Sequence, residues 1–236
     1  MDETTSHHWY FAYGSNMSLS VLTGRRSIKP LKVELVSIPS HVLCFNVPGM
    51  PYTEPAMGGI SEKQHKGQES VTGVAYMLTD DDFSRLVASE GGGIAYTLVQ
   101  LDSLSLRDGS TIPINTFTAR RPVSIGKQRL PSERYMGLLI NGAKEHGLPP
   151  CYIARLVVQP TFRAGTTRRW ILGRWLFNLL WQPVSRWIQW GVRTYMDSSG
   201  HVPTWYLTGF DFLLDLMWAQ HDYLHRFLWG RGDGLQ

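Results

Sequence analysis

Near the N-terminus the sequence reads WYFAYGSNM over residues 9–17, a short aromatic run that stops at Gly14, Ser15 and Asn16. Aromatic residues favour a strand, and a glycine followed by two small polar residues favours a tight turn. The glycine also lets a ligand approach the main chain, and successive N–H groups in such a turn can hold a carboxylate. These residues are equally common in turns without a ligand, so the motif alone leaves a plain turn as the alternative.

Outward from this motif, the pattern over residues 1–160 predicts several short strands and few helices. Strands are expected within residues 31–47, 71–78, 95–106 and 112–117, where apolar and β-branched residues gather between turn residues. One helix is expected from the cap residue Thr79 to Glu90, and another over residues 133–145, capped by Ser132 and ended by Gly147. This pattern predicts an α+β fold with a twisted sheet or small barrel.

The composition excludes several classes of protein. The chain has 236 residues, 43% of them hydrophobic, which is enough for a core and excludes a fully disordered chain. A net charge of +4 is too small to indicate nucleic acid as a partner. The two cysteines, Cys44 and Cys151, cannot form a disulfide framework or a zinc cage by themselves. The polar N-terminus and the lack of a long apolar run predict a cytoplasmic protein.

Two further motifs carry polar groups that can act in a site. Glu90 is followed by three glycines, which leave the carboxylate open to a substrate and make it a candidate for general acid–base chemistry. A solvated glutamate beside a flexible turn is the plainer interpretation. Tyr135 follows Ser132 on a predicted helix, and by itself this motif indicates only where the helix begins and ends.

Taken together and in this order, the motifs resemble the γ-glutamylcyclotransferase family. The resemblance rests on the N-terminal run from Tyr10 to Met17, on Glu90 with its glycines and Tyr96, and on Tyr135 ahead of residues 142–149, GAKEHGLP. It covers roughly residues 8–160. One departure is a glycine segment before Tyr96 that is about one residue shorter than in the animal enzymes.

The resemblance implies a small mixed barrel-like sheet with flanking helices, and the conversion of a γ-glutamyl amine into 5-oxoproline and the free amine. It implies Glu90 as the catalytic proton acceptor and no cofactor or metal. It implies contact between the small-molecule γ-glutamyl substrate and the following residues: Tyr10, Phe11, Ala12, Tyr13, Gly14, Ser15, Asn16 and Tyr135.

The last third of the chain differs in composition. Eight of the nine tryptophans follow Pro160, and residues 168–193 hold five arginines and no acidic residue. We therefore expect a catalytic domain over residues 1–165 and a Trp-rich helical extension over residues 166–236, with Pro183 interrupting its first helical stripe. A basic, Trp-rich helix can lie on a membrane surface, but packing on the catalytic domain is preferred.

Within the extension, His221 and His225 have the spacing of a metal-binding helical pair, but without a clear third ligand a packed pair is preferred. The extension resembles that of γ-glutamylcyclotransferases from fungal gliotoxin-type clusters. This implies a bulky glutathione conjugate of a diketopiperazine as the substrate. The alternatives are ordinary turnover of glutathione or γ-glutamyl dipeptides, a non-catalytic member of the fold that binds γ-glutamyl compounds, and a structural protein of the membrane surface.

Overall fold

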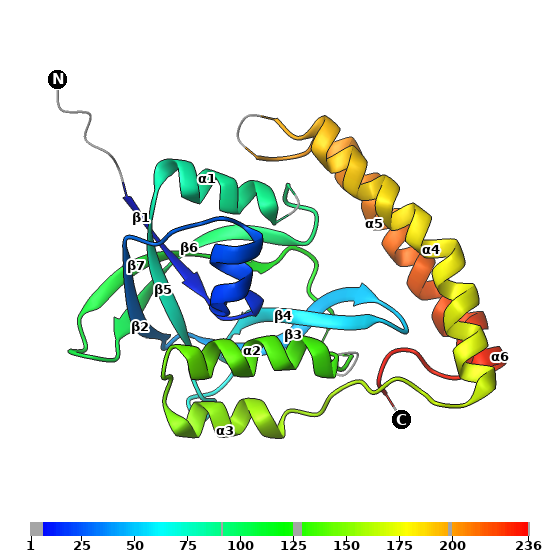
Figure 1. Ribbon diagram of the computed structural model, residues 1–236, viewed down its shortest axis with the longest axis horizontal. Coiled ribbons are helices and arrows are strands. Elements are labelled where there is room, and N and C mark those ends of the chain that lie inside the picture. Colours follow the sequence, from blue (N-terminus) through cyan, green and yellow to red (C-terminus); the bar gives the residue numbers. More distant parts are fainter. Residues whose placement is uncertain (1–6, 91, 125–128, 198–199, 236) are drawn as a thin grey trace.

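The computed structural model describes residues 7–90, 92–124, 129–197 and 200–235. Figure 1 shows two parts side by side. A sheet with helices above and below it is formed by the residues before Pro160, and a pair of long helices is formed by the residues after it. The α+β class expected from the sequence is confirmed.

Five strands close into a barrel in the order β1-β5-β2-β6-β7. Their bounds are β1 (His7–Ala12), β2 (Lys32–Ile38), β5 (Val71–Thr79), β6 (Tyr96–Ser105) and β7 (Thr111–Ala119). β1 pairs antiparallel with β5 and parallel with β7, so the sheet is mixed. Because the barrel is closed, the end of β1 and the turn after it are held against both neighbouring strands.

A separate antiparallel ribbon consists of β3 (His41–Met50) and β4 (Glu54–Glu62). It extends from the barrel towards the C-terminal helices (Figure 1). The sequence pattern did not predict β4, because Pro55 and the pair Gly58-Gly59 are unusual within a strand. The glycines have a steric reason: a Cβ on Gly59 would lie 2.1 Å from Asn46 Oδ1.

Three helices cover the barrel: α1 (Asp80–Ser89), α2 (Glu133–Glu145) and α3 (Pro150–Val158). The predicted caps are present, since the hydroxyl of Thr79 accepts from Asp82 N at 3.2 Å and that of Ser132 from Tyr135 N at 3.0 Å. The α3 helix was not predicted, because Pro149, which directly precedes its first residue, was interpreted together with Gly147 as the end of the preceding helix. At Gly142, α2 approaches the turn after β1 so closely that a Cβ would lie 2.6 Å from Ser18 N.

The C-terminal part contains α4 (Arg168–Tyr195), α5 (Thr204–Gln220), a π-helical turn (His221–His225) and α6 (Arg226–Trp229). The α4 helix continues through Pro183, although the sequence analysis expected an interruption there. The buried residues Phe177, Trp181 and Val192 lie on one face and hold both halves of the helix against the rest of the molecule. Within the described ranges, no helix has both the length and the hydropathy needed to cross a bilayer.

The C-terminal helices pack on the tip of the β3–β4 ribbon. Tyr52 lies between the two strands and is 1% exposed, with its ring centroid 5.4 Å from that of Trp170 and 5.3 Å from that of Phe177. Trp218 Nε1 donates to Gly49 O at 3.1 Å. On the opposite side, Trp175, Trp187, Trp190 and Trp205 are each more than half exposed. Packing therefore accounts for only one face of these helices.

The segment after α6 returns to this junction. Gly232 N donates to His221 Nε2 at 2.9 Å, and Gly232 O accepts from Tyr52 N at 2.7 Å. The other His221 ring nitrogen lies 2.7 Å from Asp222 Oδ1, and His225 Nε2 donates to Gly173 O at 2.9 Å. The two histidines are therefore packed side chains whose nitrogens hold the chain in place.

A second junction joins the α4–α5 connection to the segment after Glu90. Val202 N donates to Gly92 O at 3.1 Å, and Val202 packs with Ile94 and Met196. Gly92 has a φ of +63°, and a Cβ there would lie 2.9 Å from Val202 Cγ1. A glycine is therefore favoured at residue 92 for two reasons: its φ is positive, and a side chain there would collide with the C-terminal part.

Candidate active site

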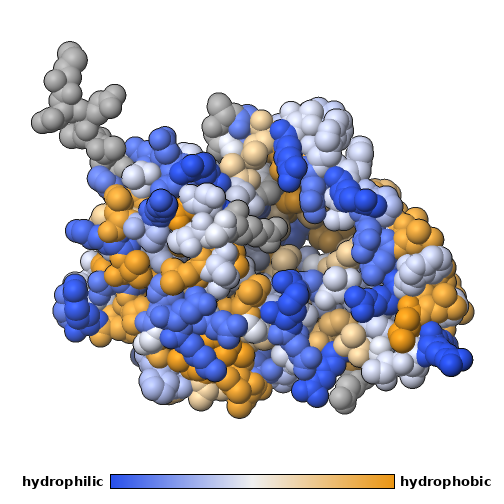
Figure 2. All heavy atoms as spheres, in the orientation of Figure 1, coloured by the Kyte–Doolittle hydropathy of each residue, from blue (hydrophilic) through white to orange (hydrophobic). Residues whose placement is uncertain are grey.

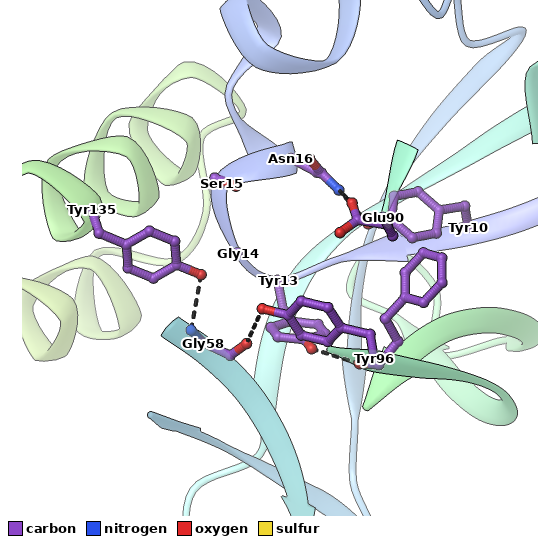
Figure 3. Close-up of a pocket in the computed structure, with 10 residues that line it drawn as sticks. Tyr10, Tyr13, Gly14, Ser15, Asn16, Gly58, Glu90, Tyr96 and Tyr135 are labelled. Atoms are coloured by element: carbon purple, nitrogen blue, oxygen red, sulfur yellow. Dashed lines mark hydrogen bonds between the residues drawn. The ribbon is translucent and has the colours of Figure 1, made fainter. Parts of the chain in front are cut away.

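A narrow cavity of about 40 Å³ lies at the end of β1, where the 3₁₀ turn Ser15–Met17 meets α2 and β4. Figure 3 shows the residues that line it. Those described are Tyr10, Tyr13, Gly14, Ser15, Asn16, Gly58, Glu90, Tyr96, Phe117 and Tyr135. Closure of the barrel and packing of α1 and α2 thus bring together residues that lie far apart in the sequence.

Glu90 enters the cavity from the C-terminal end of α1, with its side chain 14% exposed. Its Oε1 atom accepts from Asn16 Nδ2 at 2.9 Å and pairs with a guanidinium nitrogen of Arg26 at 2.7 Å. Both contacts go to the same oxygen, and Figure 3 shows the other oxygen turned into the space between the labelled tyrosines. One oxygen is therefore held by the protein, and the second faces the cavity.

The tyrosine hydroxyls around Glu90 are neutral groups. Burial raises the pKa of Tyr10 well above its usual range, and the nearby Glu90 carboxylate raises it further. Burial likewise raises the pKa values of Tyr13, Tyr96 and Tyr135. These hydroxyls stay protonated at physiological pH and can donate or accept hydrogen bonds, but they cannot act as bases. Among the described lining residues, Glu90 therefore carries the only carboxylate suited to proton transfer.

Tyr135 reaches the cavity from the first turn of α2. Its hydroxyl accepts from Gly58 N at 2.9 Å, and a Cβ on Gly14 or Gly58 would lie only 3.1 or 2.8 Å from it. Tyr96 OH donates to Gly58 O at 3.0 Å, and Tyr13 OH donates to Phe117 O at 2.5 Å. The two glycines thus make room for the Tyr135 hydroxyl, and the backbone fixes the rings around the cavity.

Two of the residues predicted to bind substrate do not line this cavity. Side chains alternate across a strand, so the run from Tyr10 to Ala12 cannot point to one side. Phe11 is 0% exposed in a core cluster with Ile38 and Ile114, and Ala12 is buried in the cluster that contains Val74. Roles for Phe11 and Ala12 in substrate binding stay predictions, whereas the other predicted positions converge on the cavity.

The sequence interpretation did not assign Arg26, Gly58, Tyr96 or Phe117 to the site. Tyr96 belongs to the motif that carries the family resemblance and was the nearest signal. Gly58 lies on the unpredicted β4 strand, and Arg26 follows a π-helical turn with no spacing that links it to Glu90. Only the folded chain brings these residues to the cavity.

The set of donors suits proton transfer rather than metal binding. The described lining residues include one carboxylate, which is already paired with Arg26, and neither histidine nor cysteine. A carboxylate whose one oxygen is held by Arg26 and Asn16 can still use the other to accept a proton from an ammonium ion and return it to a leaving amine. The arrangement therefore fits acid–base chemistry on a small polar group.

Comparison with known proteins identifies the fold to which this barrel belongs. A solved structure of a gamma-glutamyl cyclotransferase superposes with a TM-score of 0.57 and 20% identity, covering 69% of this chain and 94% of that chain. The AIG2-like family model matches residues 63–156, and the model of the AclK C-terminal domain matches residues 166–227. The architecture is thus that of the γ-glutamyl cyclotransferase fold with an added C-terminal domain.

Two fungal relatives share nearly the whole chain. The gamma-glutamyl cyclotransferase gliK of Claviceps purpurea is 44% identical over 92% of this chain and 100% of its own length. The gamma-glutamyl cyclotransferase gliK of Aspergillus fumigatus is 36% identical over 96% of this chain and 89% of its own. The chain belongs to this fungal γ-glutamyl cyclotransferase family.

Proposed function

We propose that the protein converts a γ-glutamyl amine into 5-oxoproline and the free amine, with Glu90 as the general base and acid. The observation that carries this proposal is the Glu90 carboxylate, which is held through one oxygen by Asn16 and Arg26 and faces the cavity with the other. Family membership supports the same reaction. The proposed substrate is a small molecule, without nucleic acid as a partner and without a cofactor.

The reaction moves two protons from the α-nitrogen to the leaving nitrogen of the same substrate. The α-ammonium group must lose a proton to become a nucleophile, and Glu90 Oε2 is proposed to take it. The α-nitrogen then forms a bond to the γ-carbonyl carbon and gives up a second proton, and the bond from that carbon to the leaving amine breaks. Glu90 passes both protons, one after the other, to the leaving nitrogen, which departs as an ammonium group. Atoms and charges balance without an oxidant, a reductant or a further reactant.

The remaining cavity groups can fold the substrate into the ring-closing conformation. The backbone of the turn at Gly14, Ser15 and Asn16 is proposed to bind the α-carboxylate, because successive N–H groups in a turn favour an anion. The neutral hydroxyls of Tyr10, Tyr13 and Tyr135 are proposed to contact the γ-glutamyl group. Since both reacting groups belong to one molecule, holding them in this conformation supplies much of the rate.

The substrate is further proposed to be a glutathione conjugate of fungal secondary metabolism, such as one in epidithiodiketopiperazine biosynthesis. Close similarity to the fungal relatives supports this narrower proposal. Within it, residues 1–165 carry the reaction and residues 166–236 form a packed extension. The C-terminal family model, which begins at residue 166, supports that boundary. Ordinary turnover of glutathione or a γ-glutamyl dipeptide is the competing candidate within the same chemistry.

Mass-spectrometric detection of 5-oxoproline tests the proposal. The protein and its Glu90→Gln variant are incubated separately with glutathione, γ-glutamyl-alanine and a bulky bis-glutathione conjugate. Product from the conjugate alone, absent with the variant, is the expected result. Product from the small substrates would favour ordinary turnover. Product from no substrate, or equal product with the variant, would contradict the proposed role of Glu90.

A further inference from the structure

A second cavity lies beside the Glu90 cavity, between the ribbon and the C-terminal helices. Its volume is about 240 Å³. Its walls include Met50 and Met57 from the ribbon, Trp181 and Val184 from α4, and Leu213 and Leu214 from α5. None of the described lining residues is charged. Figure 2 shows a hollow between the two parts of the molecule at this position.

The two cavities share a thin wall. On β4, Met57 lines the apolar cavity and the next residue, Gly58, lines the Glu90 cavity. At the start of β6, Ala95 likewise lines the apolar cavity and the next residue, Tyr96, lines the Glu90 cavity. Consecutive Cα atoms are ~3.8 Å apart, so the two spaces are separated by about one residue. A group attached to the leaving amine by a few bonds is long enough to span this separation.

Ion pairs hold the α5 side of this cavity in place. The guanidinium group of Arg120, at the end of β7, pairs with Asp211 of α5, and Arg120 Nε donates to Ile94 O at 3.0 Å. Asp211 directly follows Phe210, which lines the cavity. Arg121 adds a contact of 3.1 Å to Asp215 on the next turn of α5. The apolar walls are therefore fixed before a ligand arrives, which lowers the cost of binding.

We propose that this apolar cavity binds the uncharged, apolar substituent of the leaving amine, and so selects γ-glutamyl substrates with a bulky apolar group. The inference rests on the proposed function. Its walls come partly from α4 and α5, so the selectivity depends on the C-terminal helices rather than on the barrel alone. Because the described lining residues carry no charge, an aliphatic or aromatic ring is a better occupant than a carboxylate or an ammonium group.

A pair of probes that differ only in an apolar group tests the proposal. Glutathione and S-benzylglutathione carry the same γ-glutamyl bond, and kcat/KM for each is measured from 5-oxoproline release. We expect the protein to prefer S-benzylglutathione by ~10-fold or more, since burying a ring of this size stabilises the complex. Leu213→Asn, which makes the wall polar, is expected to reduce that preference ratio by ~10-fold.

Two further variants control for an unfolded or disturbed chain. Val184→Phe fills the cavity without adding a polar group and is expected to reduce the same ratio. Leu216→Asn makes the matched change on the exposed side of α5 and is expected to leave the ratio unchanged. An equal ratio in the unaltered protein, Leu213→Asn and Val184→Phe would overturn the proposal.

A binding measurement separates failure of this inference from failure of the proposed reaction. In the Glu90→Gln background, calorimetry compares the affinities for S-benzylglutathione and glutathione with and without Leu213→Asn. Tighter binding of S-benzylglutathione that Leu213→Asn abolishes supports the apolar site, even if no 5-oxoproline forms with the unaltered protein. Equal affinities for the two probes would refute the apolar site whether or not the reaction occurs.

Discussion

The two neighbouring cavities are lined by different kinds of side chain, which come from different parts of the chain. The cavity at Glu90 measures about 40 Å³ and is framed by tyrosines, Asn16 and a carboxylate, all from the barrel and the segments around it. The apolar cavity measures about 240 Å³ and exists only where α4 and α5 meet the ribbon. The contrast teaches that the residues for the reaction and the residues for substrate choice can reside in separate parts of one chain.

The largest effect is expected from Tyr52→Ala, which would detach the two parts from each other. Tyr52 is 1% exposed and packs against Trp170 and Phe177. Removal of a large buried aromatic ring costs about 3–5 kcal/mol of unfolding free energy. Denaturant titration followed by tryptophan fluorescence measures the loss, because eight of the nine tryptophans lie in the C-terminal part. Tyr223→Ala, at a position 82% exposed, is the matched control, and an equal loss there would contradict the interpretation.

The variant Glu90→Gln tests whether the Glu90 cavity alone performs the reaction. If the Glu90 cavity performs the proton transfer for every substrate, kcat should fall by ~100-fold or more with glutathione and S-benzylglutathione alike. The amide keeps the shape of the carboxylate, so the chain should still fold, but the melting temperature should fall because the largely buried Arg26 loses its ion-pair partner. Glu62→Gln, at an exposed glutamate at the end of β4, is the control. A decrease in kcat with only one of the two substrates would contradict the assignment of proton transfer to the Glu90 cavity and of substrate selection to the apolar cavity.

Tyr135→Phe is expected to have a smaller effect on the same cavity. The change removes the hydroxyl that accepts from Gly58 N at 2.9 Å. The same hydroxyl is proposed to contact the γ-glutamyl group, and loss of one hydrogen bond to the substrate costs about 0.5–1.5 kcal/mol of binding free energy, so KM should rise by roughly 2–10-fold, with little change in kcat. Steady-state kinetics with glutathione measures the two constants separately. Tyr152→Phe removes a hydroxyl from a buried ring of α3, outside the cavity lining, and an equal rise in KM there would assign Tyr135 to the core.

The smallest effect concerns pH, and it involves both parts of the molecule. Burial lowers the pKa values of His41 and His146 in the barrel part and of His221 in the C-terminal part. Below about pH 6.5 the unfolded chain binds protons that these folded sites reject, so the free energy of unfolding falls as the pH drops below that value. The melting temperature should therefore decrease from pH 7.5 to pH 5.5.

The variant His221→Gln isolates the C-terminal share of that decrease. Its melting temperature should fall less steeply over the same pH range, whatever its stability at pH 7.5, because one of the three proton-rejecting groups is gone. His65→Gln, at an exposed position, should leave the slope unchanged. An identical slope in His221→Gln and the unaltered protein would exclude His221 as a source of the pH dependence.

Much of the barrel could be predicted from local signals, because those signals act within a few residues. The strand from His7 to Ala12 is aromatic and ends two residues before Gly14, and the Thr79 and Ser132 caps lie at the starts of α1 and α2 as predicted. The β4 strand escaped prediction because its glycines make room for Asn46 and Tyr135. That requirement appears only when distant segments pack together.

The same distinction holds for the sites. Glu90 and Tyr135 were predicted because they belong to recognisable motifs, and both line one cavity. Arg26 was not predicted, since its contact with Glu90 depends on how the segment after β1 folds back over α1. The apolar cavity also has no local signal, because Met57, Trp181 and Leu213 are ordinary core residues in the sequence and form a cavity only in combination.

The contact between Gly92 and Val202 has a consequence for how this family can diverge. The two residues lie far apart in the chain, yet one backbone hydrogen bond joins them, and no side chain fits between them at residue 92. An insertion among the glycines would push against the α4–α5 connection, and a longer connection would press on the glycines. In an alignment of relatives, the lengths of these two segments should therefore covary, so that they are inherited as one unit.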